Sequence, residues 1–114
     1  MTGYLTTHVL DTASGLPAAG MKIDLYRIEG ETRAHIVGMV TNDDGRTDSP
    51  ILPAGDFAVG RYELVFQAGD FFGRDEDISF LDEIPLRFGM NDPTSHYHVP
   101  LLVSPFSFST YRGS

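Results

Sequence analysis

The chain has 114 residues, 41% of them hydrophobic, and a formal net charge of −8 at pH 7, from 8 Lys and Arg against 16 Asp and Glu. This length fits one compact domain, residues 1–114, and the acidic excess excludes a nucleic-acid partner, whose phosphates need clustered cations. The absence of cysteine excludes disulfides, a thiol nucleophile and thiolate metal sites. Twelve Gly and seven Pro favour a turn-rich all-β domain over a helical bundle.

Alternation of apolar and polar residues recurs along the whole chain and predicts short strands separated by turns. We expect strands at residues 4–10, 21–27, 34–40, 61–68, 84–88, 96–103 and 106–111, with at most a brief edge strand at 49–53 between two prolines. Residues 11–20 have the composition of a loop, so the first two strands are expected to pair. One helical turn is expected within residues 69–77. Seven or eight strands at this spacing predict a β-sandwich.

The same alternation assigns side chains to the faces of strands. His96 and His98 fall on one face of their strand, with Tyr97 on the other. In the first strand, one face carries Tyr4, Thr6, His8 and Leu10. Two further strands have an apolar face that would point into the core, formed by Met21, Ile23 and Leu25 in one and by Tyr62, Leu64 and Phe66 in the other.

Three of the four histidines, His8, His96 and His98, are candidates for chemistry. Three imidazoles can bind zinc, but the sequence does not show that their strands converge. Solvated or hydrogen-bonded histidines without a function are the plain alternative. An imidazole with an ordinary pKa of ~6.5 is also the best general base at neutral pH. The spacing alone leaves these alternatives open.

Arg46 follows directly on the turn sequence Asn-Asp-Asp-Gly at residues 42–45. Short polar side chains and a glycine favour a turn with positive φ at this point. A surface ion pair with Asp43, Asp44 or Asp48 is the ordinary role for such an arginine. The alternative is a permanently charged fork that holds a carbonyl, a carboxylate or a urate-like anion. Neither role is decided by the local sequence.

The chain ends in a phenol, a guanidinium, a glycine and a hydroxyl, supplied by Tyr111, Arg112, Gly113 and Ser114. These residues extend the last expected strand, which should hold them against other groups. Chain ends are usually frayed. A tail of this composition, held by a strand, indicates half of a ligand site.

The first residues contain neither the basic nor the apolar region of a signal peptide. No apolar run approaches the ~20 residues that a spanning helix needs. We therefore expect a cytoplasmic protein without a membrane partner. A mature periplasmic form, from which a signal peptide has been removed, stays open.

Three separated segments together resemble a known family. They are LTTHVLDTASG at residues 5–15, TNDDGRTD at 41–48 and HYHVPLLVSPFSFSTYRGS at 96–114. These segments resemble the 5-hydroxyisourate hydrolases, the transthyretin-like enzymes of urate breakdown. The resemblance implies a transthyretin-like β-sandwich of two four-stranded sheets with one short helix. It also implies a homotetramer whose active sites lie in the cleft between two dimers.

The resemblance further implies the residues of the site. His8, Arg46 and His98 would be catalytic, and the substrate would be bound by His8, Arg46, Tyr111, Arg112, Gly113 and Ser114. His96 belongs to the motif without an assigned catalytic role. The reaction would be hydrolysis of 5-hydroxyisourate to 2-oxo-4-hydroxy-4-carboxy-5-ureidoimidazoline, with no metal and no cofactor required. His98 or His8 would deprotonate water and Arg46 would stabilise the developing negative charge.

Two other functions share the expected fold. The vertebrate hormone carrier transthyretin binds a small molecule without catalysis, and fold does not fix function. In that carrier the corresponding strand lacks the two histidines and the terminus lacks the Tyr-Arg-Gly-Ser ending, while a deep channel of apolar and small residues binds the hormone. A structural or adhesive sandwich, with incidental His and Arg, is the second alternative.

Overall fold

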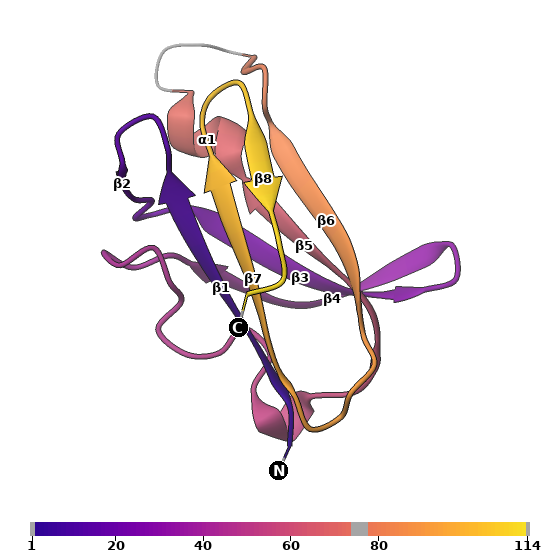
Figure 1. Ribbon diagram of the computed structural model, residues 1–114. Helices are drawn as coiled ribbons and strands as arrows, with labels where there is room; N and C mark the ends of the chain where they lie inside the picture. The colour runs from indigo at the N-terminus through magenta and orange to yellow at the C-terminus, as the bar shows by residue number, and fades with distance from the viewer. Residues whose placement is uncertain (1, 74–77, 114) are drawn as a thin grey trace.

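The computed structural model describes residues 2–73 and 78–113. Its strands are β1 (Tyr4–Asp11), β2 (Leu16–Pro17), β3 (Lys22–Glu29), β4 (Thr32–Val40), β5 (Gly60–Gln67), β6 (Glu83–Met90), β7 (His96–Val103) and β8 (Phe108–Thr110). A short α-helix, α1 (Ala68–Phe72), and a 3-10 turn, η1 (Ala54–Asp56), complete the elements. One sheet has the order β2-β1-β7-β8 and the other β4-β3-β5-β6. The two sheets form the layers of a sandwich (Figure 1), which confirms the expected pair of four-stranded sheets.

The expected pairing of the first two long strands is wrong. β1 lies parallel to β7, with Thr6 opposite His98, while β3 belongs to the other sheet. Alternation reveals which side chains share a face, but it carries no information about which strand lies alongside. The parallel pairing joins the two ends of the chain, so residues near the N-terminus lie beside the histidines of β7 (Figure 1).

The core lies between the sheets, and its composition follows the alternation. Both predicted apolar faces point inward, and their side chains are almost fully buried: Met21, Ile23, Leu25, Tyr62, Leu64 and Phe66. Leu5 and Val9 of β1 pack against them with Leu101 and Val103 of β7. The opposite face of β1 is therefore free to carry the polar residues Thr6 and His8.

The short elements differ from expectation in detail. β2 lies within the expected loop, where it pairs with the end of β1. The expected edge strand at 49–53 is reduced to a single bridge between Leu52 and Leu5, although Ile51 and Leu52 are both buried. α1 forms the expected helical turn at Ala68–Phe72, and residues 74–77 of that prediction lie outside the described residues. No helix in the described part of the chain is long and apolar enough to cross a membrane.

Candidate active site

Three distant segments meet on the outer face of the β1–β7 pair. An isolated backbone bridge joins His8 of β1 to Arg46, and another joins His98 of β7 to Gly113. Because β1 and β7 are neighbours, both bridges bring their residues to one part of the sheet. Four of the residues implied by the resemblance are thus brought together by the fold.

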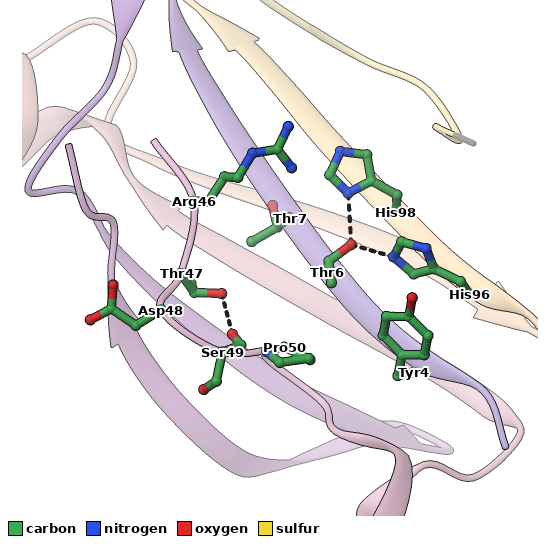
Figure 2. Close-up of a pocket in the computed structure, with 10 residues that line it drawn as sticks. All are labelled: Tyr4, Thr6, Thr7, Arg46, Thr47, Asp48, Ser49, Pro50, His96 and His98. Carbon is green, nitrogen blue, oxygen red and sulfur yellow. Dashed lines mark hydrogen bonds between the residues drawn. The ribbon is translucent and has the colours of Figure 1, made fainter. Parts of the chain in front are cut away.

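A pocket of about 340 Å³ opens beside these residues. Figure 2 shows its walls: one side comes from β1 and β7, and the other from the segment after Gly45. The residues that line it are Tyr4, Thr6, Thr7, Arg46, Thr47, Asp48, Ser49, Pro50, His96 and His98. Nearly all of them carry a hydrogen-bonding group, which suits a small polar ligand better than an apolar one.

The turn before Arg46 is built to place this arginine over β1. The side-chain carbonyl of Asn42 accepts hydrogen bonds from the amides of Asp44 at 2.9 Å and Arg46 at 3.2 Å. Gly45 has φ +74°, and its carbonyl accepts a 2.8 Å bond from the amide of Val9. Among the described residues no ion pair joins Arg46 to a carboxylate. Figure 2 shows its guanidinium turned into the pocket toward His98, so the charge is available to a ligand.

Thr6 connects the two histidines of β7. Its hydroxyl lies 2.6 Å from Nε2 of His96 and 2.8 Å from Nδ1 of His98. The ring of His96 stacks on Tyr4, with centroids 4.1 Å apart and an interplanar angle of 7°. The two imidazoles share one face of β7, as alternation predicts, while Tyr97 is buried on the other.

The electrostatic environment favours the neutral form of His98 and of His8, because it lowers the pKa of each. Burial, and then the positive charge of Arg46, lower the pKa of His98, with smaller contributions from His96 and His8. Burial and Arg46 also lower the pKa of His8, against an opposing hydrogen bond to the backbone of Asp44. Both effects disfavour the imidazolium form. Each ring is therefore able to accept a proton at neutral pH.

The tail divides between two places. The amide of Gly113 donates a 2.7 Å hydrogen bond to the carbonyl of His98, and a Cβ on Gly113 would lie only 2.6 Å from Cδ2 of that ring. Arg112 instead lies over Tyr97, 4.4 Å from the ring centroid, on the opposite face of β7. Tyr111 is 61% exposed, and with Arg112 it lines a second pocket against β6. Ser114 lies outside the described residues.

Comparison with known proteins places this arrangement in a family. The family model described as HIUase/Transthyretin matches residues 5–113. The chain belongs to the HIUase/transthyretin family. A relative named 5-hydroxyisourate hydrolase 2, from Rhizobium meliloti, is 58% identical over 117 residues, which cover 99% of this chain and 98% of the relative.

Solved structures of the family share the fold. The crystal structure of (S)-allantoin synthase is 50% identical with a TM-score of 0.89, and the match covers 99% of this chain and 44% of that chain. Transthyretin from Sparus aurata is 22% identical with a TM-score of 0.86, over 96% of this chain and 95% of that one. At that identity the likeness shows the fold alone, and it confirms the expected transthyretin-like sandwich.

In this member of the HIUase/transthyretin family, two site residues escaped the sequence analysis. Thr6 and Tyr4 share a predicted face with His8, but nothing local indicates that His96 and His98 lie opposite them. Within the described residues, no three His, Asp or Glu side chains are close enough to hold a metal ion. The structure thus brings together His8, Arg46, His98 and Gly113, adds Thr6 and Tyr4, and leaves Tyr111 and Arg112 apart.

Proposed function

We propose that this protein hydrolyses 5-hydroxyisourate to 2-oxo-4-hydroxy-4-carboxy-5-ureidoimidazoline in urate catabolism. The observation that carries the proposal is that Arg46 and His98 line one polar pocket, with His8 bridged to Arg46 beside it. The chain in which they meet is 58% identical to a relative named for this hydrolase. A neutral base beside a fixed cation is the combination that hydrolysis of a cyclic amide requires.

The reaction can be assigned to these groups step by step. His98 or His8 accepts a proton from water as the water oxygen bonds to the ring carbonyl carbon. Arg46 stabilises the negative charge that develops on the carbonyl oxygen. The carbon–nitrogen bond then breaks, and the protonated histidine returns its proton to the leaving nitrogen. No step of this route uses a metal or a cofactor.

We further propose that the working enzyme is a homotetramer with its sites at the dimer–dimer interface. In the single chain the pocket is open to solvent, and Tyr111 and Arg112 lie outside it. Phe80 and Phe106 are 75% and 74% exposed, with ring centroids 6.1 Å apart. Burial of such exposed aromatic rings favours association. Substrate binding by Tyr111, Arg112, Gly113 and Ser114 would then be completed at the assembled cleft.

The test follows the loss of absorbance of freshly generated 5-hydroxyisourate with and without protein. We expect acceleration over the spontaneous rate, and a loss of at least about 100-fold in kcat/KM for His98→Ala and for Arg46→Ala. His35→Ala is the matched control, because His35 lies on the other sheet. Circular dichroism checks that each variant is folded. A wild-type protein that gives only the spontaneous rate would overturn the proposal.

The same experiment separates the hydrolase from the other two functions. A carrier would show saturable iodothyronine binding with no turnover. A structural sandwich would show neither, and its properties would be unchanged by His98→Ala and Arg46→Ala. Loss of turnover in folded variants therefore supports the hydrolase alone.

A further inference from the structure

The hydroxyl of Thr6 lies between two imidazole nitrogens and has only one proton to share. Oγ1 is 2.6 Å from Nε2 of His96 and 2.8 Å from Nδ1 of His98. Both distances are short enough for hydrogen bonds. Since a hydroxyl donates one bond, Thr6 donates to one ring and accepts from the other. The tautomers of the two histidines are therefore coupled through Thr6.

We propose that Thr6 and His96 are positioning residues that fix the tautomer of His98. In this arrangement Nδ1–H of His98 donates to Oγ1 of Thr6, and the Thr6 hydroxyl donates to Nε2 of His96. Nε2 of His98 then carries a lone pair on the pocket side. The inference rests on the proposed function, because this lone pair is the one that accepts the proton of the attacking water.

The position of Arg46 selects this direction over its reverse. Figure 2 shows the guanidinium turned toward the edge of His98 that does not contact Thr6. In the reverse direction Nε2 of His98 would carry a proton that faces this permanent positive charge. A lone pair there is attracted to the same charge. Thr6 couples the two tautomers, and Arg46 on the other side of the ring selects one of the two directions that Thr6 allows.

The surroundings of His96 fit its role as the acceptor of the hydrogen bond from Thr6. Its ring is exposed and stacks flat on Tyr4, which fixes the ring plane while leaving the other nitrogen open to water. To accept from Thr6, His96 needs its proton on Nδ1, where solvent can accept the hydrogen bond. When His98 takes a proton from water, its Nδ1–H bond to Thr6 becomes charge-assisted and stronger.

This arrangement distinguishes His98 from His8 as the proton acceptor. For His8, the backbone of Asp44 acts to raise the pKa against burial and the charge of Arg46. No hydrogen bond joins the His8 ring to another side chain among the described residues. His98 has a fixed tautomer and a partner that responds to its charge, which is how an oriented general base is recognised.

The test compares Thr6→Val, which keeps the shape and removes the hydroxyl, with Thr6→Ser, which keeps the hydroxyl. We expect Thr6→Val to lower kcat about 10- to 100-fold with KM within about twofold, and Thr6→Ser to stay within about threefold of wild type. His96→Phe keeps an aromatic ring stacked on Tyr4 but removes the nitrogen that accepts from Thr6. Its kcat should lie between those of Thr6→Val and Thr6→Ser. His35→Phe is the control and should leave kcat unchanged.

Nitrogen-15 NMR of the histidine rings gives a readout that a merely structural role would not move. In the free wild-type protein, His98 should show a protonated Nδ1 and an unprotonated Nε2, and Thr6→Val should shift it toward a tautomer mixture. A wild-type His98 protonated on Nε2, or full kcat in a folded Thr6→Val variant, would overturn the inference. If Thr6→Val does not fold, the wild-type spectrum and His96→Phe decide it. If the wild type shows no turnover at all, the proposed function fails, while the spectrum still tests the tautomer.

Discussion

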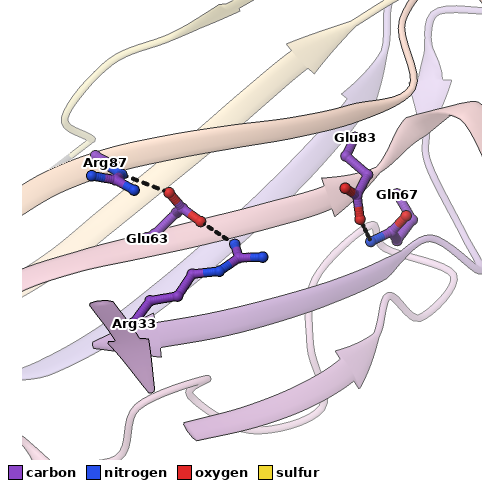
Figure 3. Close-up of polar contacts among 5 residues, drawn as sticks. All are labelled: Arg33, Glu63, Gln67, Glu83 and Arg87. Atoms are coloured by element: carbon purple, nitrogen blue, oxygen red, sulfur yellow. Dashed lines mark hydrogen bonds and ion pairs between the residues drawn. The ribbon is translucent and has the colours of Figure 1, made fainter. Parts of the chain in front are cut away.

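Glu63 is a buried carboxylate on the outer face of a sheet, where solvent would be expected. Its side chain is 4% exposed, and its two oxygens accept hydrogen bonds from Arg33 of β4 and Arg87 of β6, as Figure 3 shows. Burial is the largest single influence and raises the pKa of Glu63, but the two arginines together outweigh it and leave this pKa below its ordinary 4.5. The two arginines thus supply the hydrogen bonds that solvent would otherwise give this carboxylate.

We expect the double variant Arg33→Met with Arg87→Met to lose about 2 kcal/mol of unfolding free energy, because it leaves a buried charge without a partner. The arginines are 45% and 66% exposed, so the loss falls below that of a fully buried pair. Adding Glu63→Leu should recover most of the loss, since no charge is then left uncompensated. Urea unfolding at pH 7 measures all three free energies.

The pH dependence provides a check on this account. In the wild type, the stability supplied by Glu63 is present above its unfolded pKa of about 4.5 and is lost as the pH falls through the lower folded value. In the double variant the pH dependence of stability should reverse. Burial without the arginines raises the pKa of Glu63, so protonation of Glu63 at low pH removes the buried charge and stabilises the fold. A double variant as stable as wild type at pH 7 would contradict the role given to the two arginines.

The lowered pKa values of His98 and His8 determine the pH profile of the proposed reaction. A base that stays neutral below pH 6.5 keeps the enzyme active there, so the acidic limb of kcat/KM should lie below 6.5. The charged and titratable groups that face His98 are Arg46, His96 and His8. Arg46→Gln removes the cation and should move the limb upward in whatever activity remains. Steady-state rates between pH 4.5 and 8 locate the acidic limb of kcat/KM. An acidic limb above pH 6.5 in the wild type would contradict the prediction.

At the scale of elements, the turn before Arg46 depends on one glycine. Gly45 has φ +74°, and a Cβ there would overlap the carbonyl oxygen of Val9. We expect Gly45→Ala to cost about 2 kcal/mol or more of unfolding free energy, and to lower kcat/KM by moving Arg46. Thermal unfolding and the hydrolysis assay measure the two effects.

Gly15 offers a matched control for this substitution. Its φ is +78°, but a Cβ at Gly15 would meet no atom within 4 Å. Gly15→Ala should therefore cost about 1 kcal/mol from the backbone alone, with no change in kcat/KM. Equal effects of the two substitutions on turnover would show that the approach of Gly45 to Val9 does not position Arg46.

The sequence predicts features that depend on neighbouring residues better than features that depend on residues far apart in the chain. Alternation is local, and it correctly placed Tyr62, Leu64 and Phe66 in the core and His96 beside His98 on one face. Pairing is not local, so the parallel contact of β1 with β7 was missed, and with it the position of Thr6. Motif resemblance supplied His8, Arg46 and His98 as a set, which the period of a strand cannot do.

At the scale of the whole molecule, the C-terminal residues 111–113 show that one chain does not contain every proposed substrate contact. Gly113 packs against His98 as the strand extension predicts, because its backbone continues the sheet edge beyond β8. Tyr111 and Arg112 lie instead on the opposite face of β7, near β6. β8 ends at Thr110, so strict strand alternation does not govern the side chains of Tyr111 and Arg112. Their proposed contact with substrate therefore requires another subunit, which no pattern within one chain can reveal.

The exposed aromatic pair gives this dependence on assembly a direct test. Phe106 and Phe80 are among the most exposed large apolar side chains of the described residues, and their ring centroids lie 6.1 Å apart. We expect Phe106→Ser to weaken the homotetramer and to lower turnover in parallel with dissociation, because each proposed site needs two dimers. Light scattering measures the assembly, and the hydrolysis assay is run on the same samples across a range of protein concentrations.

Val40→Ser is the matched control, because Val40 is also exposed but lies at the end of the edge strand β4 in the other sheet. This variant should keep both the assembly and the turnover of wild type. Phe106 does not line the pocket, so a loss of activity in a folded Phe106→Ser protein is expected to act through association rather than through Arg46 or His98. A monomeric Phe106→Ser protein with full turnover would show instead that one chain carries a complete site, and that Tyr111 and Arg112 are not needed for the reaction.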